Sequence, residues 1–153
     1  MRLMKVLMTA VVVSALSSTA NAAQFRAGGS LGLFYPGFGE GTLSLSVQAP
    51  ANSSGTLQLR GVLSGGVIGG FGPVEPFLRV DTDLLNTSDG FYFGGGLGSG
   101  LSFEGDIYTL LSPLVLANAH LIVGKDFGSY SLEGIARLGF ISGVGVRASF
   151  PLR

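Results

Sequence analysis

One side chain of this sequence, His120, is suited to proton exchange near neutral pH, because it is the only histidine of the chain. A nucleophilic site would also need an activated Ser and a carboxylate that orients the imidazole. No spacing in the sequence assigns either partner to His120. The chain has no Cys, which excludes thiolate chemistry and disulfides, and it has no His or Cys cluster to supply metal ligands. We therefore expect no enzymatic activity, no metal and no cofactor, and interpret His120 as a hydrogen-bonded interior residue.

The charged residues fall on the polar positions of stretches that alternate polar and apolar side chains. Between residues 77 and 84, Arg79, Asp81 and Asp83 alternate with Leu78, Val80 and Thr82. Side chains of a β-strand point to opposite faces with period two, so each such stretch has one polar and one apolar face. Repeated along a chain with few charges, this pattern predicts a membrane β-barrel with a polar interior and an apolar exterior.

The start of the chain has the features of a secretory signal peptide. Arg2 and Lys5 form a positive region, residues 6–16 are apolar, and Ala20-Asn21-Ala22 matches a cleavage site. The apolar region is too short for a transmembrane helix. We predict a signal peptide over residues 1–22 and a single β-barrel domain over residues 23–153.

The composition of the predicted mature chain excludes several classes of protein. Without Arg2 and Lys5, the nine basic residues become seven against nine acidic ones, a net charge of about −2 that does not favour nucleic acid as a partner. Charged residues make up 12% of the chain, whereas soluble domains average roughly 25%. No later apolar run reaches about 18 residues, so a helical membrane protein is excluded.

Turn residues rich in Gly, Pro, Asn and Asp divide the domain into eight candidate strands. The predicted strands are residues 24–34, 42–49, 56–68, 76–84, 91–103, 113–124, 129–139 and 143–152. Strands of this length can cross a bilayer at a tilt. An even number of antiparallel strands can close without exposed edges and with both termini on one side. The predicted fold class is therefore an all-β, eight-stranded antiparallel up-and-down transmembrane β-barrel.

Aromatic residues gather at the predicted strand ends, as in the aromatic girdles of membrane barrels. One predicted girdle contains Phe25, Phe91, Phe93, Phe127, Tyr130 and Phe150, and the other contains Phe34, Tyr35, Phe38, Phe71, Phe103, Tyr108 and Phe140. Between them, we predict that Leu57, Leu59, Leu63, Val80, Val144 and Val146 face lipid.

Signal peptide, strand count, alternation and aromatic ends together resemble the small eight-stranded outer-membrane barrels of the OmpA-transmembrane-domain and OmpX type. The resemblance covers the whole mature chain and concerns architecture, since no specific motif carries it. Such barrels often end in an aromatic residue, whereas here Phe150 lies three residues before the end. The resemblance implies a monomer in the bacterial outer membrane with lipid as its partner, and a structural, envelope or surface-contact role.

The polar face predicts which side chains fill the lumen. The predicted charge network consists of Arg26, Arg60, Arg79, Asp81, Asp83, Glu104, His120, Glu133, Arg137 and Arg147. Uncharged members include Ser30, Ser44, Gln48, Gln58 and Asn118. Eight strands leave just enough space for side chains, so these residues are expected to form a plug of paired charges rather than an open pore. Interior glycines such as Gly94, Gly96, Gly98 and Gly145 would leave room for Arg heads or mark bends.

Two other functions fit parts of the pattern. Eight-stranded barrels of two known types modify lipid A, and the deacylase type carries a His-x-Ser pair. Here Leu121 and Ile122 follow His120, and His120 falls on the lumen face rather than toward lipid. Alternation alone does not say which face points inward, and the inverted arrangement would be a soluble secreted barrel that binds a small apolar ligand.

Overall fold

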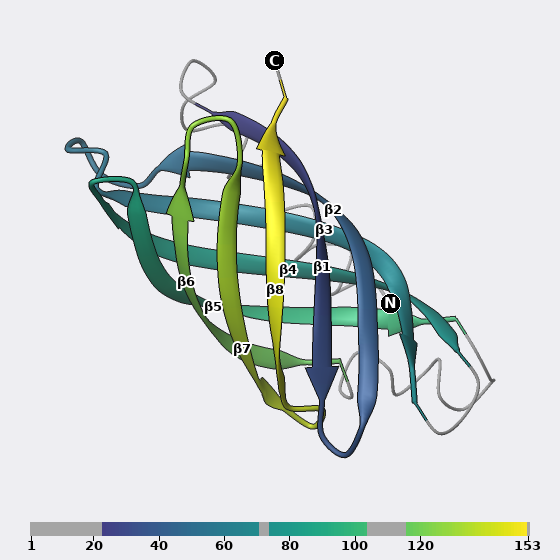
Figure 1. Ribbon diagram of the computed structural model, residues 1–153. Helices are drawn as coiled ribbons and strands as arrows, with labels where there is room; N and C mark the ends of the chain where they lie inside the picture. Colours follow the sequence, from purple (N-terminus) through teal and green to yellow (C-terminus); the bar gives the residue numbers. More distant parts are fainter. Residues whose placement is uncertain (1–22, 71–73, 104–115, 153) are drawn as a thin grey trace, which may run out of the picture.

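The computed structural model describes residues 23–70, 74–103 and 116–152, which form eight antiparallel strands (Figure 1). The strands are β1 (Gln24–Phe34), β2 (Phe38–Pro50), β3 (Leu57–Gly69), β4 (Glu75–Ser88), β5 (Phe91–Ser102), β6 (Asn118–Asp126), β7 (Ser131–Gly139) and β8 (Gly143–Pro151). Each strand pairs with the next, and β8 pairs with β1, so the sheet closes on itself. The predicted eight-stranded, up-and-down closed barrel is confirmed, while residues 1–22 lie outside the described residues.

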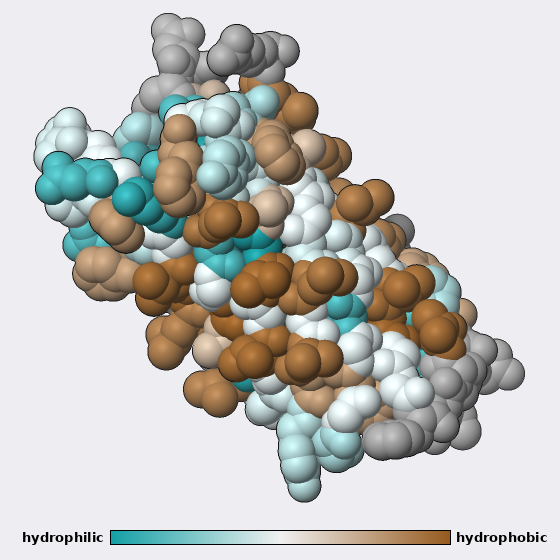
Figure 2. Space-filling view, in the orientation of Figure 1, coloured by the Kyte–Doolittle hydropathy of each residue, from teal (hydrophilic) through white to brown (hydrophobic). Residues whose placement is uncertain are grey.

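The two faces of the sheet differ sharply, as the alternation predicts. Along β7, Ser131, Glu133 and Arg137 are buried in the lumen, while Leu132 and Leu138 are 48% and 64% exposed on the outer wall. Of the residues predicted to face lipid, four are exposed on the outer wall and Leu57 and Val80 are half-buried. Figure 2 shows apolar side chains along the wall, with surface of intermediate hydropathy between them.

The barrel has two ends that we name by their contents. The terminal end holds the start of β1, the end of β8 and the connections β2–β3, β4–β5 and β6–β7. The loop end holds the connections β1–β2, β3–β4 and β7–β8. Both chain ends of the described barrel therefore lie at the terminal end.

Two hairpins are tighter than the sequence predicted. Ser88 pairs with Phe91, so the β4–β5 loop is only Asp89-Gly90. Both residues have positive φ, 51° and 78°, which is the type I′ geometry that Asp-Gly favours in two-residue hairpins. The expected turn over residues 86–90 was therefore too long, and β4 continues to Ser88.

The β1–β2 hairpin was also predicted too long, because its glycines suggested a turn from residue 35 to 41. In the structure Phe34 pairs with Phe38, and only three residues connect the strands. The expected start of the sixth strand at residue 113 lies outside the described residues. Within them β6 begins at Asn118, whose side chain donates to the Leu116 carbonyl and so competes with sheet pairing just before the strand.

Aromatic side chains gather at the terminal end, where Phe25, Phe91, Phe93 and Phe150 are 50–61% exposed on the outside. At the loop end, two members of the predicted girdle lie on inward-facing positions, namely Phe34 and its pairing partner Phe38, which is half-buried. Phe34 is only 6% exposed, because even-numbered positions of β1 face the lumen. Tyr35, Phe103 and Phe140 are exposed there, and Phe71 and Tyr108 lie outside the described residues.

The lumen also contains an apolar cluster, which the polar pattern did not predict. Leu85, Tyr92, Ile122 and Ile135 pack together at 1–8% exposure. Eight strands leave a lumen that side chains can fill, and here both apolar and charged side chains fill it. The described residues form no helix with the length and apolar character needed to cross a membrane.

Candidate functional site

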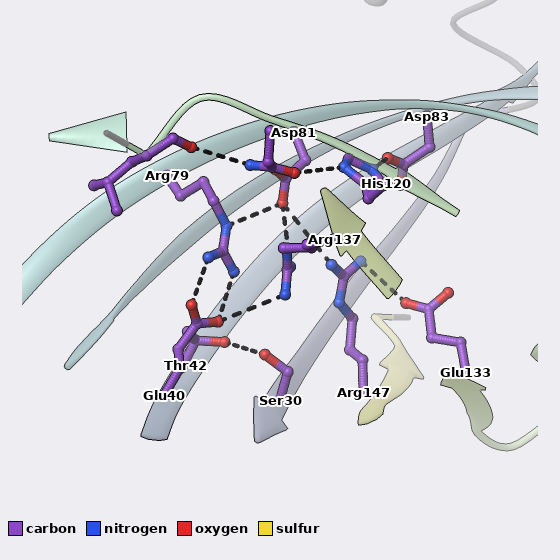
Figure 3. A network of polar contacts seen from close by, with 12 residues as sticks. Ser30, Glu40, Thr42, Arg79, Asp81, Asp83, His120, Glu133, Arg137 and Arg147 are labelled. Atoms are coloured by element: carbon purple, nitrogen blue, oxygen red, sulfur yellow. Dashed lines mark hydrogen bonds and ion pairs between the residues drawn. The ribbon is translucent and has the colours of Figure 1, made fainter. Parts of the chain in front are cut away.

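Asp81 is the carboxylate around which three arginines gather inside the barrel (Figure 3). Its Oδ2 accepts from Arg79 Nε at 3.3 Å, and it lies 3.8 Å from Arg137 Nη2 and 3.9 Å from Arg147 Nη2. The three arginines come from β4, β7 and β8, so this one carboxylate connects strands on different sides of the lumen. Asp81 has no exposed surface, and the ion pairs offset the cost of burying its charge.

Glu40 provides a second centre of negative charge toward the loop end. Arg79 Nη1 and Nη2 donate to its two carboxylate oxygens at 2.6 and 2.8 Å, a bidentate fork. Arg137 Nη1 lies 3.8 Å from Glu40 Oε1. Arg79 therefore uses Nε for Asp81 and both terminal nitrogens for Glu40, which lysine could not do.

A second group of ion pairs lies on the side of the terminal end. Arg60 Nε donates to Asp83 Oδ2 at 2.8 Å, and its Nη1 donates to Glu133 Oε2 at 2.9 Å. Glu133 Oε1 lies 3.0 Å from Arg147 Nη1, and Tyr92 donates its hydroxyl to Glu133 Oε2 at 3.2 Å. Because Arg147 also faces Asp81, the two groups form one continuous network.

His120 joins this network through Asp83. Its Nε2 lies 2.6 Å from Asp83 Oδ1, and its Nδ1 lies 2.9 Å from Asn118 Oδ1. The Asn118 amide nitrogen donates to the Leu116 carbonyl, which fixes its oxygen toward the ring. Both ring nitrogens thus lie within hydrogen-bond distance of side-chain oxygens. Among the described residues, the side-chain partners of the His120 ring are Asp83 and Asn118.

Arg26 forms a separate pair close to the terminal end. Its Nη1 donates to Asp126 Oδ2 at 2.9 Å and its Nε donates to Ser149 Oγ at 3.2 Å. Asp126 is partly exposed, with 38% of its side chain accessible, whereas Arg26 is buried. The Arg26 pair therefore lies at the boundary between the lumen and the barrel mouth.

Glycines of β5 make room for the carboxylates rather than for Arg heads. A Cβ on Gly96 would meet Asp83 Oδ1 and His120 Nε2 at 2.6 Å, and a Cβ on Gly98 would collide with Asp81 Oδ1. Gly94 and Gly145 instead lie against the carbonyls of Leu84 and Leu31 on neighbouring strands. The glycine-rich sequence of β5 thus allows side chains from β4 and β6 to meet across it.

The structure brings nine of the ten predicted network residues into the lumen at 0–5% exposure. These are Arg26, Arg60, Arg79, Asp81, Asp83, His120, Glu133, Arg137 and Arg147. The tenth, Glu104, lies outside the described residues. Five buried arginines are matched by five carboxylates, Glu40, Asp81, Asp83, Asp126 and Glu133.

Three members of the network were missed by the sequence analysis. Glu40 and Asp126 were assigned to turns. Tyr92 was not assigned to the lumen, because it lies between Phe91 and Phe93, which face outward. In each case, the alternation of inward and outward positions along the strand would have placed the residue in the lumen. Glu40 continues the even-numbered inward positions of Thr42 and Ser44 once β2 is extended to Phe38.

No family model matches this chain, and no curated protein matches it. The described residues contain no group of three or more His, Asp or Glu arranged to hold a metal ion. The site is a buried network of salt bridges in a small eight-stranded barrel.

Proposed function

We propose that this protein is a bacterial outer-membrane barrel with a non-enzymatic, structural role in the cell envelope, and that its ion-paired lumen is closed to solutes. The main support for the proposal is that the barrel is polar inside and apolar outside, the reverse of a soluble protein. The network arginines and carboxylates lie inside, while Leu33, Leu43 and Val146 are 63–78% exposed on the wall. An apolar surface of this extent around a barrel is suited to lipid and not to water.

Strand length and the aromatic residues support a membrane location. The strands contain 9–14 residues, and about 9–11 are needed to cross a bilayer at a tilt. Exposed Phe side chains at both ends match the positions of interfacial girdles. A signal peptide over residues 1–22 would direct the chain to the envelope, where we expect it to insert as a monomer.

The two alternatives are less consistent with the interior. A soluble barrel for an apolar ligand would need an apolar cavity, whereas this lumen contains the charge network and its wall is apolar outside. A lipid-modifying enzyme would need catalytic groups within reach of lipid. His120 is 3% exposed and bonded to Asp83 and Asn118 inside the barrel.

Membrane fractionation combined with gel mobility tests this proposal. The protein should sediment with outer membranes, require detergent for extraction, and migrate differently on SDS gels before and after boiling. Recovery of the folded protein from the aqueous fraction without detergent would refute the membrane assignment.

A further inference from the structure

We infer that the terminal end of the barrel contains a binding site for a small neutral polyhydroxylated molecule, of about the size of one sugar ring. The site is a cavity of about 260 Å³ between the strand ends and the ion-paired network. This volume is just below the roughly 300–1,000 Å³ typical of ligand pockets, so it fits a small ligand. The inference goes beyond the structural role and does not depend on the membrane location.

A row of three polar side chains leads from the mouth of this cavity to its inner end. Gln24 pairs with Gln48 across β1 and β2, and Gln48 pairs with Arg60 across β2 and β3. Gln24 is exposed, Gln48 is half-buried and Arg60 is 3% exposed. All three line the cavity, so a molecule that enters from the mouth meets polar groups along its whole path.

Hydrogen-bonding capacity is left over along this row. The described residues supply no side-chain hydrogen bond to the amides of Gln24 and Gln48. The Nη2 atoms of Arg60 and of Arg26, a further lining residue, have no protein partner within the described structure, but they are buried and present almost no surface to the cavity. The amides of Gln24 and Gln48 therefore carry the recognition, because amides both donate and accept, a combination that matches hydroxyl groups.

The charges around the cavity select against an ionic ligand. Arg60 is already bonded to Asp83 and Glu133, so a ligand anion at the inner end of the cavity would lie near two carboxylates as well as this guanidinium group. A ligand cation would face the guanidinium groups of Arg26 and Arg60. Arg26 and Asp126 neutralise each other at the mouth. A neutral hydroxyl group can bond to the amides of Gln24 and Gln48 without adding an unpaired charge.

Three sugars with the same ring and different charge test the inference: glucose, glucosamine and glucuronate. Saturation-transfer NMR on the purified protein, in a zwitterionic detergent without sugar headgroups, reports their binding. We expect transfer to glucose, and weaker transfer to both charged sugars. Transfer to none of the three, or stronger binding of either charged sugar than of glucose, would overturn the inference.

Variants locate the site. Gln48→Leu should weaken glucose binding about fivefold, the effect of one lost hydrogen bond. The matched control is Asn86→Leu, because Asn86 lies near the same end but is exposed and does not line the cavity. Unboiled gel mobility confirms that each variant is folded. If Gln48→Leu does not fold, Gln24→Leu at the exposed mouth replaces it. Unchanged binding in the folded Gln variant would overturn the assignment.

Discussion

Asp83 and His120 are bonded at 2.6 Å although they belong to strands that are not neighbours. Asp83 in β4 and His120 in β6 both pair with Gly96 in β5, so the two side chains approach from either side of this glycine. A Cβ on Gly96 would lie 2.6 Å from the bonded atoms of both residues. The absence of a side chain at one position therefore allows two strands to be connected through the lumen.

The first prediction concerns this glycine. Gly96→Ala should push Asp83 and His120 apart and also press on the Thr82 carbonyl oxygen of β4, which the added Cβ would meet first. We expect it to lower the free energy of unfolding by about 1–3 kcal/mol, the typical cost of overpacking. Gly134→Ala is the control, because the nearest atom to its added Cβ would be 3.9 Å away. The chain has no Trp, so urea unfolding followed by circular dichroism measures the difference. Equal stability of the two variants would show that the contact contributes nothing.

The second prediction concerns Glu133, which faces Arg60, Arg147 and Tyr92. Glu133→Gln keeps the volume but removes the charge, and leaves buried cationic charge that the remaining carboxylates do not balance. Loss of one partner from a buried ion pair typically costs about 3–5 kcal/mol, and we expect a loss in this range.

Asp89→Asn provides the matched control for Glu133→Gln. It makes the same change of carboxylate to amide in the exposed β4–β5 turn, where Asn-Gly also favours the type I′ geometry. Its stability should therefore be within about 0.5 kcal/mol of the unmodified protein. Urea midpoints compare the two variants, and a Glu133→Gln protein as stable as the control would contradict the structural role of the network.

Alternation predicted much of the site because a strand side chain has only two possible directions. Once Arg79 was placed on the polar face, Asp81 and Asp83 had to share it, and the structure buries all three. Phe34 was misplaced because its aromatic character suggested a girdle, although its even-numbered position on β1 directs it inward. Position in the alternation was here a better guide than residue type.

The pairing of the charges could not be predicted in the same way. Which residues meet across the lumen depends on the stagger between strands and on tilt, which alternation does not contain. His120 bonds to Asp83 through the gap at Gly96, and Arg79 reaches Glu40 two strands away. Such contacts depend on how all eight strands are aligned with one another in the closed barrel.

The third prediction concerns the fork between Arg79 and Glu40. Arg79→Lys preserves the charge but cannot bond both Glu40 oxygens and Asp81 together, and should cost about 1.5–3 kcal/mol. Lys125→Arg, on the outer wall near the terminal end, should change stability by no more than about 0.5 kcal/mol.

A double-mutant cycle with Glu40→Gln tests whether the Arg79 effect arises from this pair. The effects of Arg79→Lys and Glu40→Gln should be clearly non-additive, because the residues are in direct contact. Simple addition of the two effects in urea unfolding would contradict the importance of the fork.

The fourth prediction tests the outer wall. Leu63 lies at the middle of β3 and is 51% exposed, so Leu63→Arg should place a charge in the lipid and cost about 2–4 kcal/mol in bilayers. Leu63→Met is the control because it remains apolar. Folding into lipid vesicles, followed by the heat-dependent gel shift, measures both variants. Equal insertion of the two would argue against contact between this wall and lipid.

The last prediction concerns conduction through the barrel. Arg60→Ala should lower the unfolding midpoint, because it leaves Asp83 and Glu133 without their shared partner. It should not create substantial ion conductance, since Arg79, Arg137 and Arg147 remain buried in the lumen. Planar-bilayer recordings of the unmodified protein and the variant measure this directly. Steady open-state currents from the unmodified protein, of the size seen with wide porins, would refute the closed lumen and make transport the better proposal.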